Sequence, residues 1–340
     1  MAGAVRAVPG GPVTGIGALA AFLERGIGAG PVTMRRIGDG HSNLTHLVSG
    51  PGWSVVLRRP PPPPIPPGAH DVLREAALLT GLAGSGVPVP RVLATAAAGE
   101  VLDAPLYVMT HVAGPVVTER TPQPLAAPAE RRAAGESLAD TLAALHAVDW
   151  RAAGLTSMGR PEGFNARHLR RIRGLVADAA GDLPPGFGPV HEWLEARVPA
   201  ESGATIVHGD YRLGNVVLAP DAPGRVAAVL DWELATLGDP LHDVGYLLAS
   251  WPAPGEPLVP TAALGAAALE PGWPTRVELA QRYADASGRD PGDLRWYTAF
   301  ALWKLAVLFD YSRRRGTDPY YADPGQVRSF LAAAERATLA

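Results

Sequence analysis

The chain has 340 residues, and 30 basic against 33 acidic residues give it a formal net charge of −3. This length is typical of about two domains, and the balanced charge excludes the strongly basic surface by which proteins bind nucleic acids. The absence of cysteine excludes disulfides, a thiol nucleophile, cysteine-ligated zinc and iron–sulfur clusters. We therefore expect a cytoplasmic protein without a nucleic-acid partner.

The basic residues are divided unevenly between two types. Lys304 is the only lysine, and the other 29 are arginines. Chemistry that proteins normally assign to lysine must use Lys304 or an arginine. The longest apolar run, residues 298–309, is interrupted by Lys304 and is shorter than the roughly 20 residues of a membrane-spanning helix. We expect no membrane span, and the oligomeric state stays open.

The first part of the chain has the pattern of a β-rich lobe. Helical spacing of apolar residues predicts helices over 16–23 and 70–82, and the second contains Glu75. The proline run 60–67 predicts an extended polyproline connector, or else a ligand for an SH3-type domain. Strands are predicted at 32–37, 44–48, 53–58, 87–93 and 106–110.

The rest of the chain has the pattern of a helical lobe. We place the boundary after Val112, which gives lobes 1–112 and 113–340. One predicted hairpin interrupts the helices, with arms 215–219 and 225–231. Symmetric pairing about Pro223 would make Asn215 and Asp231 cross-strand neighbours. Helices are predicted at 129–146, 167–179, 190–197, 276–286, 294–314 and 326–339.

Three oxygen-bearing side chains meet at the open end of this predicted hairpin. Asp231 and Asn215 lie on its two arms, and Asp210 comes just before the first arm. Two carboxylates and a carboxamide form the kind of hard oxygen cluster that suits Mg²⁺ with phosphate ligands. The alternative is that both aspartates only form turns or cap helices.

The segment from His208 to Asn215 reads H-G-D-Y-R-L-G-N. It matches the kinase catalytic-loop spacing H-x-D-x-x-x-x-N, in which the aspartate receives the proton of the acceptor hydroxyl and the asparagine holds Mg²⁺. Asp231 follows Asn215 by 16 residues and takes the place of the metal-binding aspartate. This spacing predicts Asp210 as the catalytic residue and Asn215 and Asp231 as metal ligands.

With Leu230-Asp231-Trp232-Glu233, Gly238-Asp239-Pro240 and Asp243, this loop resembles the aminoglycoside phosphotransferase family of small-molecule kinases. Residues 37–45, 56–60 and the pair Trp303-Lys304 resemble the subgroup related to the kinase-like domain fused to some acyl-CoA dehydrogenases. The resemblance implies a two-lobed, protein-kinase-like α+β fold. Its N-lobe is an antiparallel sheet with one main helix, and its C-lobe is mostly helical with the catalytic hairpin.

The resemblance also implies how the N-lobe binds ATP, with GTP not excluded. Arg58, or alternatively Arg59, stands where the family has a lysine that touches the phosphates, and Glu75 is its helix partner. Thr110 and Val112 would offer backbone groups to the base. The turn between the first two strands would contact the triphosphate through Gly38, Gly40, Ser42 and Asn43.

Five further residues are expected to support the catalytic loop. His208 would hold the loop by hydrogen bonds, and Asp239 and Asp243 would cap and anchor a helix that begins near Pro240. Arg212 would lie beside the reacting groups, and Glu233 would either support them or simply be exposed. A metal-dependent phosphohydrolase built on His208, Asp210, His242 and Asp243 is a weaker alternative, because further histidine ligands are missing.

The acceptor is expected to be a small molecule with a hydroxyl group. Arginines cluster at 167–173 and 313–315, and no acidic cluster that would suit a polycationic aminoglycoside is evident. Most such arginine runs are solvated helix faces. We favour a neutral or anionic hydroxyl compound, and the subgroup resemblance suggests a hydroxyacyl-CoA. An aminoglycoside kinase and a non-catalytic nucleotide-binding protein remain the alternatives.

Overall fold

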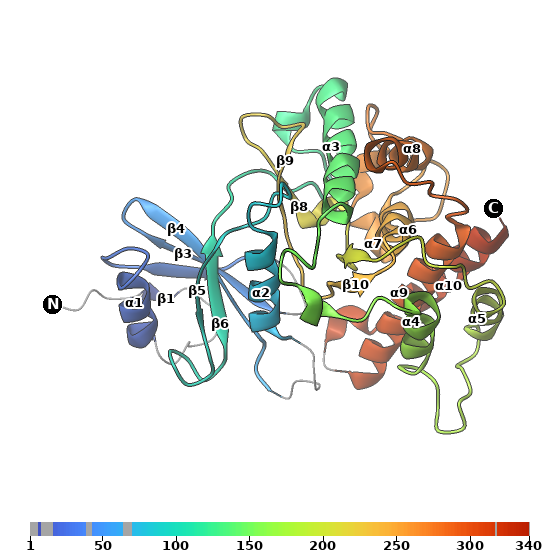
Figure 1. Ribbon diagram of the computed structural model, residues 1–340, viewed down its shortest axis with the longest axis horizontal. Coiled ribbons are helices and arrows are strands. Elements are labelled where there is room, and N and C mark those ends of the chain that lie inside the picture. Colours follow the sequence, from blue (N-terminus) through green and yellow to red (C-terminus); the bar gives the residue numbers. More distant parts are fainter. Residues whose placement is uncertain (1–5, 8–15, 39–42, 64–69, 317, 340) are drawn as a thin grey trace. The chain divides into compact units, whose positions relative to one another are not determined.

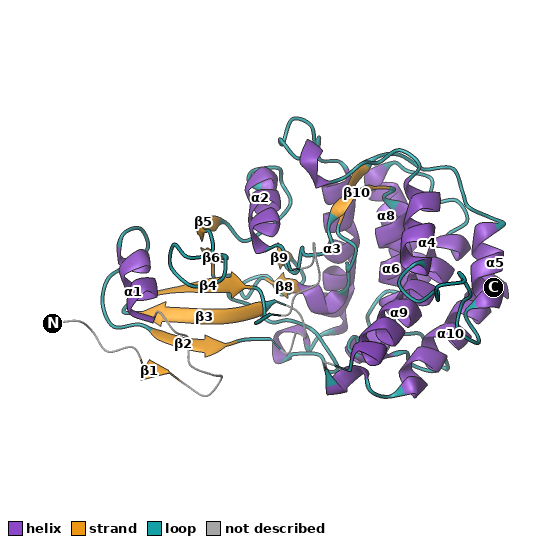
Figure 2. Cartoon of the chain, turned by 90° about the horizontal axis from the view of Figure 1, so that it is seen from below, coloured by secondary structure: helices purple, strands orange, loops and turns teal. Residues whose placement is uncertain are grey.

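The computed structural model describes residues 6–7, 16–38, 43–63, 70–316 and 318–339. The chain divides into two compact units, residues 1–113 and 114–340. The first contains the main sheet and the second contains most of the helices (Figures 1 and 2).

The first unit is built on a six-stranded sheet in the order β1-β2-β3-β4-β6-β5. The pairs from β2 to β5 are antiparallel, as predicted, and the two-residue β1 adds a parallel edge. The strands are β1 (Arg6–Ala7), β2 (Thr33–Arg36), β3 (Leu44–Gly50), β4 (Trp53–Arg59), β5 (Val92–Ala96) and β6 (Leu106–Thr110).

Two helices accompany this sheet. Leu19 and Leu23 of α1 (Ile16–Glu24) are buried in one cluster with Val48 and Leu57 of the strands. The second helix, α2 (Val72–Leu82), packs against β5 and β6. Asp71 caps α2 by accepting a hydrogen bond from the backbone N–H of Arg74, so the helix begins two residues after the predicted start.

The strand predicted over residues 87–93 was wrong in its bounds. Residues 87–91 are not strand, and β5 runs from Val92 to Ala96. Pro88 and Pro90 have no N–H to donate to a sheet, so pairing starts only after them. The predicted polyproline connector lies partly in residues 64–69, outside the described residues.

The second unit consists mainly of helices around a buried aromatic core. The long α9 packs against α6 and α10, and it contributes Phe300 and Trp303 to the core beside Phe330 of α10. The periodic segments predicted as helices are confirmed, with ends shifted by up to six residues. The helices are α3 (Pro128–His146), α4 (Phe164–Arg173), α5 (Gly188–Glu195), α6 (Leu241–Ser250), α7 (Pro260–Ala263), α8 (Arg276–Ser287), α9 (Arg295–Arg315) and α10 (Pro324–Leu339).

Four short strands position the motif residues of this unit. Strand β7 (Thr205–Val207) pairs with β10 (Thr236–Gly238), and β8 (Val216–Leu218) pairs with β9 (Val226–Val229). The loop 208–215 therefore runs from the end of β7 to the start of β8, and residues 230–235 connect β9 to β10. Both connecting segments are anchored at each end by buried strands.

The predicted hairpin forms, but its predicted register was wrong by one residue. Val216 pairs with Val229, and the backbone N–H of Leu230 donates to Asn215 O at 2.8 Å. Asn215 therefore faces Leu230 rather than Asp231. The register shifts between Val217 and Leu218, where Ala227 is the extra residue of a bulge in β9. Beside the turn, Leu218 pairs with Val226, so the turn is centred on Ala222 rather than Pro223, and the bulge offsets one of the two residues of difference.

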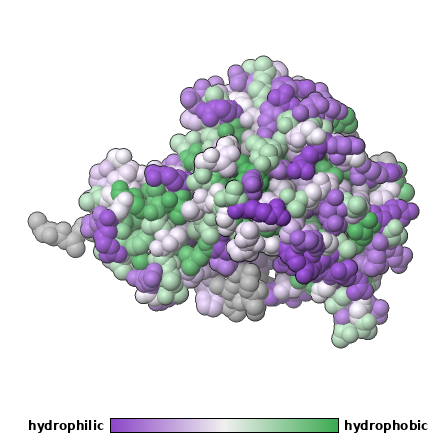
Figure 3. Space-filling view, viewed as in Figure 1, coloured by the Kyte–Doolittle hydropathy of each residue, from purple (hydrophilic) through white to green (hydrophobic). Residues whose placement is uncertain are grey.

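No helix in the described part of the chain is long and apolar enough to cross a membrane. Hydrophilic side chains cover much of the visible face of the 114–340 unit (Figure 3).

Candidate active site

The loop 208–215 is held first by the imidazole of His208. Its Nε2 lies 2.9 Å from Leu230 O, and its Nδ1 lies 3.2 Å from the backbone nitrogen of Asp210. Because a backbone N–H can only donate, Nδ1 is the acceptor and the ring hydrogen is on Nε2, which donates to the carbonyl. The ring also lies 4.5 Å from that of the buried Trp232. His208 thus connects the loop to the segment that follows β9.

Asp243 of α6 holds the same loop by its backbone. Its carboxylate accepts hydrogen bonds from the backbone N–H groups of His208 at 2.6 Å and Gly209 at 2.8 Å. His146 Nε2 approaches it at 3.2 Å, and Tyr283 in turn binds His146 Nδ1. Burial alone would raise the pKa of Asp243, but the hydrogen bonds from His146 and from the backbone N–H of Gly209 help to outweigh burial and lower it. A buried carboxylate therefore fixes the two residues that precede Asp210.

Asp239 and Asp243 differ in their roles at α6. Asp239 accepts from the backbone N–H of Leu241 at 3.1 Å, so it satisfies a donor at the helix start as predicted. It also accepts from Tyr297 and from Asn165. Asp243 was expected to act in the same way, but its carboxylate points to the loop backbone instead.

Asp210 lies between two neighbours from its own loop. Asn215 Nδ2 donates to Asp210 Oδ2 at 2.7 Å and to Asp210 O at 2.8 Å. Arg212 Nε lies 3.4 Å from Asp210 Oδ1. Burial opposes the charge of Arg212, but Asp210, Tyr246 and Asp231 outweigh it and raise the pKa of Arg212. These contacts orient one carboxylate in a loop that is itself tied to α6.

Asp231 has a left-handed backbone conformation, with φ of 64°, that residues other than glycine rarely adopt. Such strain at a residue without a local need for it is typical of functional sites. The next residue, Trp232, is buried and donates from Nε1 to Val229 O at 2.9 Å, which holds the turn. Glu233 is half-buried. Burial raises the pKa of Tyr321, and the negative charge of Glu233 adds to that rise.

The donor set fits Mg²⁺ in the manner expected for a nucleotide site. Because Nδ2 of Asn215 is turned to Asp210, the amide oxygen is the atom of this side chain that remains for a cation, and the carboxylate of Asp231 would be the second ligand. In the described part of the chain, no three His, Asp or Glu residues form a metal site. His242, which the phosphohydrolase alternative needs as a ligand, instead binds Asn165 Oδ1 through Nε2 at 2.9 Å. Mg²⁺ commonly takes one or two protein oxygens and completes its shell with phosphate and water.

Sequence reasoning missed Tyr246 and did not connect Lys304 to the loop. Tyr246 is buried three residues after Asp243 on α6, and its pKa is raised well above the usual value by burial and by Asp210. Lys304 Nζ donates to Gly209 O at 3.0 Å. Helical i, i+3 spacing from Asp243 could have found Tyr246, whereas nothing local in the sequence connects Lys304 with residues 95 positions before it.

In the first unit, Arg58 and Glu75 form a buried ion pair. Arg58 Nε donates to Glu75 Oε2 at 2.9 Å, and Arg58 Nη1 donates to Thr45 Oγ1 at 3.2 Å. The two charged side chains are 11% and 2% exposed. The side chain predicted to replace the family's lysine is thus paired with the glutamate predicted as its partner, whereas Arg59 is not in this pair.

The other predicted nucleotide contacts are only partly visible. Gly38 has a left-handed backbone with φ of 75°, and Asn43 is buried. Gly40 and Ser42 lie outside the described residues. The N–H of Thr110 already donates to Arg91 O at 2.9 Å, so this donor is not available to a base. Val112 is half-buried after the end of β6.

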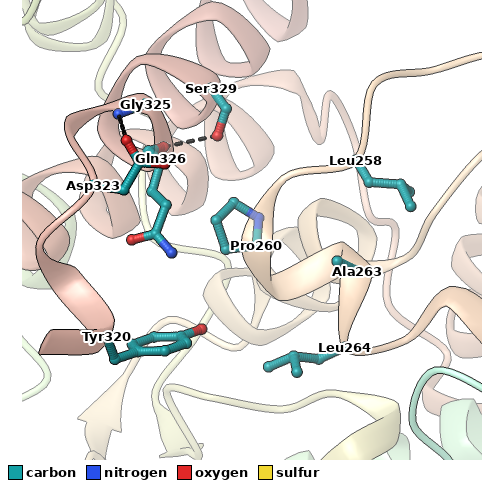
Figure 4. A pocket seen from close by; sticks show the side chains of 9 residues that line it. All are labelled: Leu258, Pro260, Ala263, Leu264, Tyr320, Asp323, Gly325, Gln326 and Ser329. Carbon is teal, nitrogen blue, oxygen red and sulfur yellow. Dashed lines mark hydrogen bonds between the residues drawn. The ribbon is translucent and has the colours of Figure 1, made fainter.

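An open groove of about 400 Å³ lies in the second unit (Figure 4). One wall comes from Leu258 and α7, and the other comes from Tyr320 and the first turns of α10. Burial raises the pKa of Tyr320, and the charge of Arg212 opposes part of that rise. Tyr320 is therefore near enough to Arg212 of the loop to interact with its charge. The lining residues are Leu258, Pro260, Ala263, Leu264, Tyr320, Asp323, Gly325, Gln326 and Ser329.

Comparison with known proteins matches residues 33–297 to the "Phosphotransferase enzyme family". Mouse acyl-CoA dehydrogenase family member 10 is 30% identical over 280 residues, which are 82% of this chain and 26% of that protein. The chain thus spans about a quarter of the length of this relative.

Solved structures show the same fold. A Ralstonia eutropha JMP134 protein, provisionally assigned as an aminoglycoside phosphotransferase, is 31% identical with a TM-score of 0.73 over 94% of this chain and 98% of that one. A thermostable mutant of aminoglycoside phosphotransferase APH(4)-Ia, solved with AMP-PNP and hygromycin B, has a TM-score of 0.60 over 94% and 98% of the two chains. At 18% identity it shows the fold alone. The predicted kinase-like fold is confirmed.

Proposed function

Because the chain belongs to the phosphotransferase enzyme family, we propose that it transfers the γ-phosphate of ATP to a hydroxyl group of a small molecule, with Mg²⁺ as cofactor. One observation carries this proposal. Asp210 is oriented by Asn215 and Arg212 in a loop with the spacing of a kinase catalytic loop. A relative of the same fold was solved with AMP-PNP, which supports ATP as the donor.

Asp210 is the residue that receives the acceptor proton. Its Oδ2 is held by Asn215, and its Oδ1 lies near Arg212. As the bond between the acceptor oxygen and phosphorus forms and the bond to the leaving ADP oxygen breaks, the hydroxyl proton passes to this carboxylate. Correct placement of the acceptor accounts for much of the rate in such reactions.

Asn215 and Asp231 would hold Mg²⁺ through one amide oxygen and one carboxylate. The bound ion would neutralise charge on the triphosphate. Arg212, whose charge is favoured by Asp210 and Asp231, would add positive charge near the transferred group.

In the first unit, Arg58 would contact the phosphates of ATP. Its guanidinium is kept in one orientation by Glu75 and Thr45, and a planar guanidinium binds phosphate oxygens well. An arginine at this position replaces the usual lysine while retaining its charge. The backbone at Thr110 and Val112 would contact the base, which leaves the choice between ATP and GTP to experiment.

The acceptor that the site supports best is neutral or anionic, with a hydroxyacyl-CoA as the leading candidate. Lys304, Arg212 and the exposed Arg171 place positive charge in the unit that contains Asp210. The relative named as an acyl-CoA dehydrogenase family member supports an acyl-CoA-like acceptor. Several other arginines are already engaged locally, since Arg313 and Arg314 pair with Asp310.

The proposal is tested by measuring ADP release and phosphorylated product with ATP and Mg²⁺ for a panel of hydroxyacyl-CoAs and aminoglycosides. We expect turnover with a hydroxyacyl-CoA and little with kanamycin-type amines. Turnover of aminoglycosides alone would overturn the acceptor assignment. Binding of ATP without transfer to any hydroxyl compound would instead indicate a non-catalytic nucleotide-binding protein.

A further inference from the structure

Lys304 is a buried cation on α9 that touches the catalytic loop. The residue is 9% exposed, its Nζ donates to Gly209 O at 3.0 Å, and Nζ lies 4.9 Å from the centre of the Tyr246 ring. A buried ammonium is costly unless it is paired, and a carbonyl with an aromatic face compensates only part of that cost. The chain nevertheless retains a lysine at this position.

The choice of lysine is informative because the chain uses arginine at its other 29 basic positions. Arginine carries a large planar group that suits bidentate partners, whereas lysine ends in a compact point charge. Between one carbonyl and one ring face, the compact group is the one that fits. Composition alone would place an arginine here, so the local geometry accounts for the exception.

The Gly209 peptide is held from two helices at once. Its N–H donates to Asp243 of α6 at 2.8 Å, and its carbonyl accepts from Lys304 of α9 at 3.0 Å. Its φ of 84° is left-handed, and a side chain there would meet Leu234 O at 2.9 Å. The residue directly before Asp210 therefore has both backbone polar groups fixed by charged side chains of opposite sign.

We propose that Lys304 is a positioning residue for phosphoryl transfer, which fixes the Gly209 carbonyl and thereby the direction in which Asp210 faces the acceptor. This inference rests on the proposed function. Lys304 would then act in phosphoryl transfer itself, apart from any part in nucleotide binding or folding.

Burial and the neighbouring charges act on the pKa of Lys304 in opposite directions. Burial lowers the pKa of Lys304, Asp210 and Asp243 oppose that shift, and Arg171 adds to it. The charge of Lys304 in turn helps to lower the pKa values of His168 and His242, although burial is the larger cause for both. The lowered pKa means that folding disfavours the charged form of Lys304 relative to the neutral form.

The decisive variant is Lys304→Met, which keeps all but one atom of the length of the side chain and removes the charge. We expect kcat to fall about 100-fold, as for a misplaced catalytic group, with KM for ATP unchanged and with a loss of activity larger than any fall in Tm explains. Lys304→Gln keeps an N–H donor and should retain more activity than Lys304→Met. Arg282→Met, which removes an exposed cation paired with Asp140 on the surface, is the matched control and should leave kcat unchanged.

A second readout does not depend on catalysis. Lysine labelled with ¹³C at Cε gives a single side-chain signal in this chain, and its pH titration reports the state of Lys304 directly. Because Asp210 favours the ammonium, Asp210→Asn should lower the pKa seen by this signal. Absence of any response would contradict the coupling of Lys304 to Asp210, whatever the enzyme's acceptor.

The outcomes separate this inference from the function on which it rests. If wild-type protein transfers phosphate and Lys304→Met keeps its kcat, or loses activity only in proportion to a lower Tm, the positioning role is wrong. If wild-type protein transfers phosphate to no acceptor while the labelled signal responds to Asp210→Asn, the proposed function is wrong and the coupling stands.

Discussion

The role of Asp243 as the anchor of the catalytic loop leads to a quantitative prediction for Asp243→Ala. The substitution removes acceptors for the backbone N–H groups of His208 and Gly209 and for His146 Nε2, at 2.6, 2.8 and 3.2 Å. Hydrogen bonds to a charged group contribute about 1.5 kcal/mol each, so three of them contribute roughly 4.5 kcal/mol. We therefore expect the free energy of unfolding to fall by about 3–5 kcal/mol.

Urea denaturation followed by tryptophan fluorescence is a suitable assay, because seven of the eight tryptophans lie after Gly114. Asp140→Ala is the control, since its pair with Arg282 is about half exposed and should contribute less than about 1 kcal/mol. Activity of Asp243→Ala should also fall, because the residues before Asp210 lose their support. A loss of stability no larger than that of Asp140→Ala would refute the anchoring role.

Three further predictions concern protonation, backbone strain and phosphate binding. Burial lowers the pKa of His242 from 6.5 to about 4, so as the pH falls the unfolded chain takes up a proton before the folded protein does. The free energy of unfolding should therefore fall by up to ~3 kcal/mol as the pH is lowered from 6.5 to about 4. His242→Gln should flatten this part of the plot of stability against pH. Gly209→Ala places a Cβ 2.9 Å from Leu234 O and should lower kcat at least about tenfold, whereas Gly288→Ala, equally left-handed but with open space around it, should leave kcat unchanged. Arg58→Met should raise KM for ATP about tenfold or more, and Arg58→Lys should restore it, because the charge beside Glu75 is what the phosphates require; equal KM values for the two variants would contradict this.

Local patterns in the sequence predicted the parts of the site that are contiguous in the chain. The loop from His208 to Asn215 carries its own signature, and the structure brings Asn215 to Asp210. The pair Arg58–Glu75 was expected from the family resemblance rather than from a local pattern, and the two side chains meet.

What the sequence could not predict depends on contacts between distant residues or on irregular backbone. Lys304 and Gly209 meet because α9 packs against α6, and no local pattern records that packing. The predicted hairpin register was wrong because the turn is centred on Ala222 rather than Pro223, and the bulge at Ala227 offsets only one of the two residues of error. The short β7 and β10 were missed because three residues are too few for a periodicity.

Transfer of labelled γ-phosphate from ATP to a hydroxyl acceptor shows whether Asp210 receives the acceptor proton. With wild-type protein, Asp210→Asn and the control Asp140→Asn assayed side by side, we predict transfer by the wild type and the control and a loss of about 100-fold or more in Asp210→Asn, with ATP binding retained. Transfer by Asp210→Asn at a rate near that of the wild type would contradict the account.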